Sequence, residues 1–403
     1  MSYADLLRGP HVTRLLLGTL VGRLPSAMAA VAVPLALRQA GASYGFVGLA
    51  VGAFAVASAV GGPLLGRIVD RVGQPRVLLP TALVAAVGFA VVAVAPGSTA
   101  AVLGGVVLAG AATPPLEPCL RALWPDIVAP GKLESAYALD SASQELVFVG
   151  GPLVVAGGVA VASPAAALWA GALLGVAGVL VVVTAPPARA WKAPARPADW
   201  LGPLRSRGLV VLITGLTGVG VAIGTLNVLV VSYAEGHRMP GGAPALLALN
   251  ALGALTGGLA YGAVRRWRVA PPRRTLLMML GLTAGYGLLC LLPAPPYMAC
   301  LMLLTGLFLA PVLTVVFVLV GELAPAGTVT EAFAWLVTLM TAGVALGSAV
   351  TGTVLEGAGA GWAAACGVLG VAVGTLVILA GQAQLVPAAA REEAGEAPAR
   401  AAA

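Results

Sequence analysis

Charged side chains are scarce in this sequence. Only 9% of its 403 residues are Asp, Glu, Lys or Arg, whereas 60% are hydrophobic. Because a water-soluble domain carries about 25% charged residues, this composition excludes an ordinary soluble protein. Aromatic residues are also few, at 5%, which leaves little surface on which a sugar ring would stack.

Cysteine and histidine are rare as well, with four and two residues. All four cysteines fall within apolar runs, which favours small packing side chains over a disulfide framework. No spacing suits a metal ion, and the sequence contains no nucleophile elbow or phosphate-binding loop. We therefore expect that the protein is not an enzyme and holds no metal and no cofactor.

Long apolar runs are what the sequence has in abundance. Twelve of them reach roughly the 20 residues that a helix needs to cross a bilayer. All twelve should be helical, because an unpaired backbone group in lipid is costly. The sequence therefore predicts an all-α membrane protein with twelve transmembrane helices, at residues 15–37, 45–67, 76–95, 101–123, 135–158, 164–184, 208–233, 243–264, 274–293, 297–320, 330–354 and 362–382.

Basic residues are unevenly distributed among the connecting segments. With the N-terminus inside, all but three of the 22 Lys and Arg residues lie in inward segments. The exceptions are Arg38 and Arg238 in outward loops and Arg23 within a span. Since short loops rich in Lys and Arg stay in the cytoplasm, we expect both termini in the cytoplasm and the chain in the plasma (inner) membrane. The net charge of +7 is then no sign of a nucleic-acid partner.

Two segments differ in composition from the apolar runs. Residues 185–207 contain five prolines and five basic residues, which is typical of a linker. Residues 385–403 are rich in alanine and mixed charges, which is typical of a disordered tail. We therefore expect a six-helix bundle at 1–184, a cytoplasmic linker at 185–207, a second six-helix bundle at 208–384, and a disordered cytoplasmic tail.

The two predicted bundles are related by one shift in numbering. Adding 196 to a position in the first half repeatedly gives a similar residue in the second, without any gap. Two parallel six-helix repeats of this kind are typical of transporters. The matching pairs are Gly62 and Gly258, Gly66 and Gly262, Gly110 and Gly306, Pro115 and Pro311, Gly131 and Gly327, Ala136 and Ala332, Tyr137 and Phe333, and Gly151 and Gly347.

A charged turn, residues 61–76, joins the second and third runs. Its pattern resembles the loop between helices 2 and 3 of the major facilitator superfamily of transporters, although Gln74 stands where the family usually has a basic residue. The resemblance implies the twelve-helix fold of two pseudo-symmetric bundles and a gate at the cytoplasmic face. The gating motif would comprise Gly66, Asp70, Arg71, Gly73, Arg76 and Arg121.

Asp70 has two expected roles within this motif. Its carboxylate can pair with the neighbouring arginines, or it can cap a helix, where the backbone leaves unpaired N–H groups. Either contact would hold neighbouring helix ends together as a latch. The alternative is that the turn is only a topology signal.

Ionisable side chains at membrane depth are costly, so each is a candidate functional residue. From their depth along the helices we expect Arg23 to pair with Glu145 and Asp140 to compete with Glu117 for Arg121. Glu117 and Arg121 are four residues apart, which places them on one helical face. The carboxylates are candidates for proton coupling, and the alternative is that they form static ties between helices.

Five side chains are candidates for a substrate cavity. An arginine suits an anion or a carboxylate, and in the fold that the sequence resembles, helix 1 lines the central path. For the asparagines, a hydrogen bond between helices is the alternative. For the methionine and the tryptophan, the alternative is packing. The five candidates are Arg23, Met28, Asn227, Asn250 and Trp335.

The predicted function is secondary active transport of a small organic molecule by alternating access. Gly151 and Pro152, followed by Gly157 and Gly158, partly resemble a motif in helix 5 of exporters of the same superfamily. That resemblance favours proton-coupled efflux by a monomer whose partners are the substrate, protons and the bilayer. The alternatives are uptake of a sugar or an amino acid by symport, and a transporter-like receptor that transports nothing.

Overall fold

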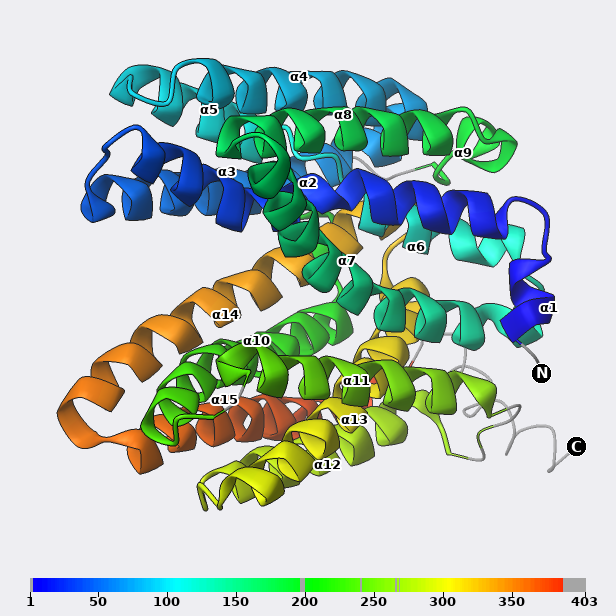
Figure 1. The fold of residues 1–403 in the computed structure, drawn as a ribbon. Helices are drawn as coiled ribbons and strands as arrows, with labels where there is room; N and C mark the ends of the chain where they lie inside the picture. Colours follow the sequence, from blue (N-terminus) through cyan, green and yellow to red (C-terminus); the bar gives the residue numbers. More distant parts are fainter. Residues whose placement is uncertain (1–2, 196–199, 240, 265–266, 268, 387–403) are drawn as a thin grey trace, which may run out of the picture. The chain divides into compact units, whose positions relative to one another are not determined.

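Every regular element in the part of the chain that the computed structural model describes is a helix (Figure 1). The described residues are 3–195, 200–239, 241–264, 267 and 269–386. The predicted tail from residue 387 onward and residues 196–199 of the predicted linker therefore lie outside the described residues. Arg266, which corresponds to Asp70 under the shift of 196, also lies outside the described residues.

The described residues divide into two compact units. Unit 1 comprises the described residues of Met1–Ala198 and Ala326–Thr338, and unit 2 comprises those of Asp199–Pro325 and Leu339–Ala403. The helices before residue 196 are α1 (Tyr3–Leu7), α2 (Val12–Gln39), α3 (Tyr44–Val72), α4 (Gln74–Val94), α5 (Thr99–Ala111), α6 (Leu116–Ile127), η1 (Pro130–Lys132), α7 (Leu133–Val161), α8 (Pro164–Val183) and, within the predicted linker, α9 (Pro186–Ala190). The helices after residue 199 are η2 (Gly202–Arg205), also within the predicted linker, α10 (Arg207–Gly236), α11 (Gly242–Ala263), α12 (Pro271–Leu289), α13 (Pro295–Leu323), α14 (Val329–Ala358), α15 (Ala360–Ala380) and η3 (Gln382–Leu385).

The helices agree closely with the predicted spans. Eleven spans of the described chain are long and apolar enough to cross a membrane, with α5 and α6 counted as one span and η1 with α7 as another. The predicted span at 274–293 is also a helix, α12, but it is not among the eleven. Its first turn carries Arg273 and Arg274, which lower its mean hydropathy. The all-α membrane fold is confirmed, and the count of twelve is close.

The fourth predicted span is broken into two helices. α5 ends at Ala111, and α6 begins at Leu116. Pro114 and Pro115 fall in the interval, and prolines cannot donate the backbone hydrogen bonds that would continue the helix. In unit 2 the corresponding helix, α13, has a single proline beyond its first turn, Pro311, and runs without interruption.

The shift of 196 is visible in the packing of each unit. In unit 1, α3 crosses α5, and in unit 2, α11 crosses α13. At each crossing, a Cβ added to one glycine of either helix would collide with the backbone of the other helix. The contacting pairs are Gly61 with Ala111 and Gly110 with Phe54 in unit 1, and Gly257 with Leu307 and Gly306 with Asn250 in unit 2. Adding 196 to the numbers of the first two pairs gives the other two. The internal repeat therefore preserves the same close helix crossing twice.

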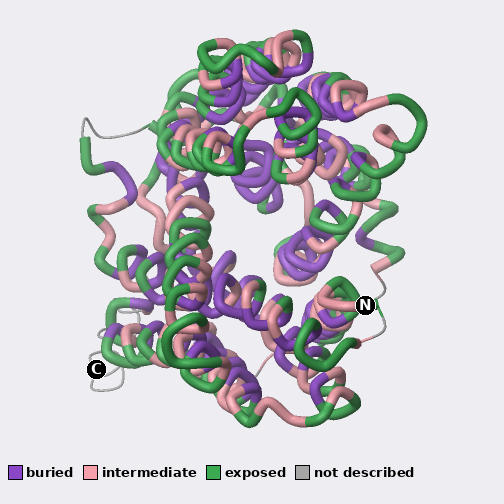
Figure 2. The backbone as a smooth tube through the Cα atoms, turned by 60° about the vertical axis from the view of Figure 1, so that its left-hand side comes forward, coloured by how far each residue is buried: buried purple, intermediate pink, exposed green. Residues whose placement is uncertain are grey.

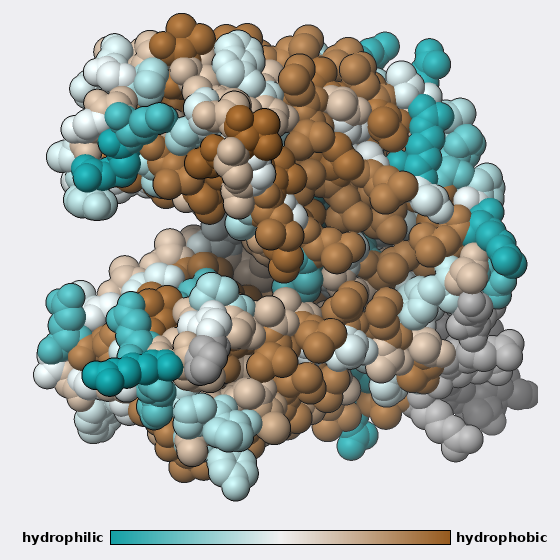
Figure 3. All heavy atoms as spheres, in the orientation of Figure 1, coloured by the Kyte–Doolittle hydropathy of each residue, from teal (hydrophilic) through white to brown (hydrophobic). Residues whose placement is uncertain are grey.

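The exterior of both units suits a bilayer. Along the long helices, buried stretches alternate with exposed ones (Figure 2). Many of the exposed side chains are large and apolar, including Leu17, Val56, Leu173 and Leu369. On the face that Figure 3 shows, apolar side chains cover much of each unit, and many of the hydrophilic ones lie towards the helix ends. An apolar exterior of this size is a liability in water and an advantage in lipid.

The glycine crossing gives a test of the packing. In Gly110→Ala, the new Cβ would lie 2.5 Å from the carbonyl oxygen of Phe54, so α3 and α5 have to separate. We expect a loss of about 1–3 kcal/mol in stability, measured as a lower unfolding temperature of the purified chain. Gly104→Ala, on the same helix, is the control, because nothing lies within 4 Å of its added Cβ. Equal unfolding temperatures for the two variants would contradict the close crossing.

Candidate functional site

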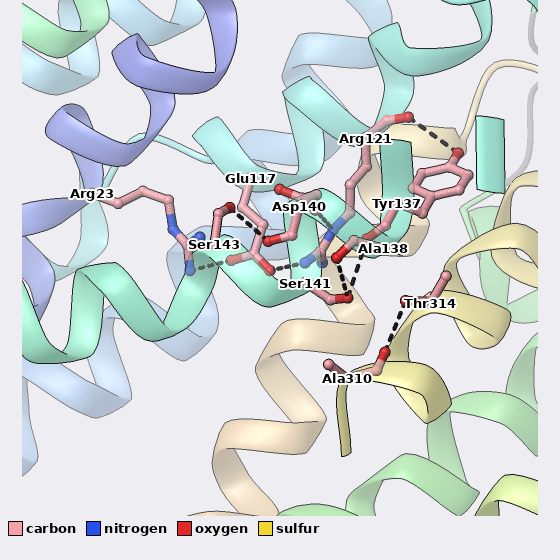
Figure 4. Close-up of polar contacts among 10 residues, drawn as sticks. All are labelled: Arg23, Glu117, Arg121, Tyr137, Ala138, Asp140, Ser141, Ser143, Ala310 and Thr314. Carbon is pink, nitrogen blue, oxygen red and sulfur yellow. Dashed lines mark hydrogen bonds and ion pairs between the residues drawn. The ribbon is translucent and has the colours of Figure 1, made fainter. Parts of the chain in front are cut away.

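Four ionisable side chains, three of them buried and one half-buried, form a continuous chain of ion pairs in unit 1 (Figure 4). Nη2 of Arg23 lies 2.5 Å from Oε2 of Glu117. The other carboxylate oxygen of Glu117 pairs with Arg121. Nε of Arg121 donates to Oδ2 of Asp140 at 2.7 Å. Positive and negative groups therefore alternate along the chain, and its formal charges sum to zero. We call these four residues the charge network.

Exposure differs along the charge network. The side chains of Arg121 and Asp140 are 1% and 2% exposed, and that of Glu117 is 8% exposed. Arg23 is 17% exposed and pairs with one carboxylate, whereas Glu117 and Arg121 each serve two partners. Arg23 is therefore the member that is most accessible to another anion.

The broken span explains how these groups come together. Because α6 begins at Leu116, Glu117 lies in its first turn, where unpaired N–H groups and the helix dipole favour a negative charge. Arg121 follows one turn later on the same face. On α7, Ser143 donates to the backbone carbonyl of Asp140 at 2.8 Å. Tyr137 donates to the backbone carbonyl of Arg121 at 3.3 Å.

The structure confirms one predicted pairing and corrects another. Glu117 and Arg121 pair directly, as their spacing indicates. The predicted pair of Arg23 and Glu145 is wrong, because Arg23 pairs with Glu117 instead. The prediction inferred depth by counting residues along unbroken helices. The break before Leu116 makes that count unreliable for the residues of α6.

Two further polar residues of α7 lie near the charge network in sequence. Glu145 is half-buried, and within the described residues its side chain has no ion pair or hydrogen bond. Gln144, one turn after Asp140, is 6% exposed, and its amide nitrogen finds no acceptor in the described part of the chain. A buried donor without an acceptor is unusual in a folded protein and calls for an explanation.

The charged turn makes a second polar site in unit 1. Asp70, at the end of α3, accepts hydrogen bonds from the backbone N–H groups of Thr330 at 3.1 Å and Glu331 at 2.9 Å. These groups belong to the first turn of α14, so Asp70 caps a helix that begins about 260 residues later in the chain. Gly66 makes this contact possible, since a Cβ there would lie 3.0 Å from Cα of Glu331. Gly73 has φ of +92°, which favours glycine.

Arg67 and Glu331 complete this contact. Nε and Nη2 of Arg67 lie 2.9 and 2.6 Å from Oε1 of Glu331. The sequence pattern omitted both residues, and their pairing has no signal in local spacing. Arg71 and Arg76 of the predicted motif are exposed, and Arg121 belongs to the charge network.

The other cavity candidates lie in varied surroundings. Met28 is buried in an apolar cluster with Val33 and Phe89. Asn227 is exposed on α10. Asn250 donates to the backbone carbonyl of Met302 and to the hydroxyl of Thr305, both at 3.0 Å, which is a hydrogen bond between helices.

Trp335 lies on α14 and is half-buried. Its indole N–H finds no acceptor among the described residues. Among these residues there is also no group of three or more His, Cys, Asp or Glu side chains that would hold a metal ion.

The fold has many solved counterparts. The human organic anion transporter MFSD10 (TETRAN) is 18% identical with a TM-score of 0.73, over 91% of this chain and 98% of that one. A bacterial homologue of the iron transporter ferroportin, in an outward-facing state, is 16% identical with a TM-score of 0.77 over the same shares. The E. coli fucose:proton symporter FucP, as its N162A variant, is 17% identical with a TM-score of 0.68, over 91% of this chain and 97% of that one. At these identities the likeness shows the fold alone.

Sequence comparison gives the family. No curated protein matches the chain. The family model of the Major Facilitator Superfamily matches residues 15–330, which is more than half of the chain. The match includes both sites described above, apart from Glu331. The chain therefore belongs to the Major Facilitator Superfamily and is a multi-pass membrane protein with a transporter fold.

Proposed function

We propose that this protein is a secondary active transporter that carries a small organic anion together with a proton, by alternating access. The observation that carries the proposal is the alternating, neutral charge network, with an accessible arginine at one end and a buried carboxylate at the other. The fold is also that of a human organic anion transporter and of a fucose:proton symporter.

The anion would bind at Arg23. Its guanidinium is the most exposed member of the network and presents a planar set of donors that suits a carboxylate or a sulfonate. An arriving anion competes with Glu117 for Arg23. The unpaired amide nitrogen of Gln144 is a second donor in the same unit. The buried site thus offers positive charge and a donor to an anion, and its carboxylates already have arginine partners.

The proton would bind at Asp140. Once the anion draws Arg23 away, Glu117 depends on Arg121 alone, and Arg121 is shared with Asp140. Asp140 is then left without a full partner, and an unpaired buried carboxylate is so costly that it takes up a proton. One anion adds one negative charge to a neutral network, and one proton restores neutrality. Since such coupling is reciprocal, anion and proton bind together and cross together.

Antiport is the second candidate, because Glu145 has no partner in the described part of the chain and the exporter-like residues 150–158 lie on the same helix. In that mechanism a substrate displaces a proton, so the two move in opposite directions. The neutral network favours cotransport, and the direction of proton movement distinguishes the two mechanisms.

The Asp70 contact would act as a latch in this cycle. It holds the first turn of α14 to the end of α3 through two backbone hydrogen bonds and the pair of Arg67 with Glu331. Breaking such a cap costs about 1 kcal/mol, which is small enough for a conformational step to overcome. We propose that the latch forms and releases once in each transport cycle.

The first experiment compares Asp140→Asn with Glu145→Gln, two carboxylates on the same helix. The full chain is reconstituted in vesicles that contain a pH dye, with the potential clamped by potassium and valinomycin, and propanesulfonate is added outside. This anion is permanently charged, so it does not carry protons through the bilayer by itself. We expect acidification of the lumen with the unsubstituted chain and with Glu145→Gln. In Asp140→Asn we expect anion entry with at least tenfold less acidification.

Three other results would change the assignment. Loss of acidification in Glu145→Gln alone would move the proton carrier to Glu145. Alkalinisation with the unsubstituted chain would favour antiport. Anion entry without any pH change would remove proton coupling from the proposal.

The second experiment tests the latch with Asp70→Asn. The amide cannot offer a negatively charged oxygen to each N–H group of α14, so we expect the cap to weaken by about 1 kcal/mol. Hydrogen exchange of the peptide around Thr330 should then accelerate roughly fivefold. Asp126→Asn, an exposed aspartate at the end of α6, is the control and should leave that exchange unchanged. Unchanged exchange in Asp70→Asn would show that the cap contributes no protection.

A further inference from the structure

A cavity lies within unit 1 beside the broken span. Its walls come from α2, α4, α8 and the segment between α5 and α6. A water-sized sphere can enter about 20 Å³ of this cavity, and its mouth is open. The lining is small or apolar, including Gly22, Pro25, Ala86, Phe89 and Ala172, and no charged side chain contributes to it. A cavity of this chemistry accepts an apolar group and rejects a charged one.

The cavity shares its helices with the charge network. Ser26, one of its two polar lining residues, follows Arg23 by three positions on α2, so the two side chains are neighbours on the helix surface. Thr113, the other, precedes Glu117 by four positions. Glu117 is the carboxylate that an anion at Arg23 would displace. Arg23, the proposed anion-binding group, and a residue of the apolar cavity therefore occupy neighbouring positions on α2.

We propose that the substrate is an amphipathic anion, with its acid group on Arg23 and a short alkyl chain in this cavity. The inference rests on the proposed function and adds the shape of the substrate to it. The acid group would pair with the guanidinium, and the hydroxyl groups of Ser26 and Thr113, which line the cavity, would lie near the junction of the polar and apolar parts of the substrate. The small side chains of the lining leave space that larger residues would fill.

The length of the substrate's alkyl chain gives a quantitative expectation for binding affinity. Each methylene that moves from water into an apolar site strengthens binding roughly fourfold. If two methylenes enter the cavity, propanesulfonate binds about fifteenfold more tightly than methanesulfonate. If the cavity stays outside the anion site, the two anions bind almost equally.

The experiment measures the dissociation constants of methanesulfonate and propanesulfonate by calorimetry on the purified full chain. Ala172→Leu fills the cavity from α8, and Ala177→Leu is its control, since Ala177 is exposed on the same helix. We expect Ala172→Leu to reduce the ratio of the two constants from more than tenfold to less than threefold, with methanesulfonate binding unchanged. Ala177→Leu should keep the ratio, and Arg23→Gln should abolish binding of both anions.

A ratio near one with the unsubstituted chain would overturn the proposal, and this outcome requires no variant to fold. A ratio that persists both in Ala172→Leu and in Ala86→Leu, which fills the cavity from α4, would overturn it as well.

The proposed function is judged separately, by the movement of protons. Equal binding of the two sulfonates with acidification of vesicles would reject the cavity and keep cotransport. The expected ratio without any proton movement would keep the cavity and reject cotransport.

Discussion

The cost of an unpaired charge in a low-dielectric interior governs this structure. Removing one partner from a buried ion pair costs about 3–5 kcal/mol, because the remaining charge has lost both water and its counter-ion. Arg23, Glu117, Arg121 and Asp140 avoid that cost by alternating in sign along one chain of contacts. In the proposed cycle the same cost makes the charge network responsive, since a charge added at one end would be compensated at the other. A static tie and a coupling device are therefore built from the same contacts, and they differ in whether a ligand reaches the accessible end.

The proline-rich break in the fourth span gives unit 1 its chemistry. The two units share a repeat of 196 residues, down to the glycines at one helix crossing. In unit 2 the equivalent helix is continuous and carries no charge until Glu322 near its end. In unit 1 the interruption creates a helix start at Leu116 within the span, and Glu117 lies in that first turn. The repeat thus supplies a common frame, and the break supplies a place for a buried carboxylate in one half.

Much of the fold follows from sequence because its rules are local or periodic. Apolar run length predicts the spans, and the constant shift predicts that the two halves repeat. Spacing of four residues predicts the pair of Glu117 with Arg121. The partner of Arg23 was not predictable by counting residues, because the break alters the path of the helix that carries Glu117. The contact of Asp70 with Thr330 and Glu331 joins residues about 260 positions apart, and nothing in either segment alone indicates the other. The depth of a side chain in the membrane and the contacts between residues far apart in the sequence depend on tertiary packing. The residue pattern of a single helix does not predict that packing.

The most direct test of the central claim is to count the protons that accompany anion binding. Propanesulfonate is titrated into the purified full chain in weakly buffered detergent solution, and the pH change is measured against a blank. The charge network predicts uptake of about one proton for each anion bound, because a neutral set of four groups regains neutrality only in that way. In Asp140→Asn the uptake should disappear. Anion binding without proton uptake by the unsubstituted chain, or with proton release, would contradict the coupling of Arg23 to Asp140.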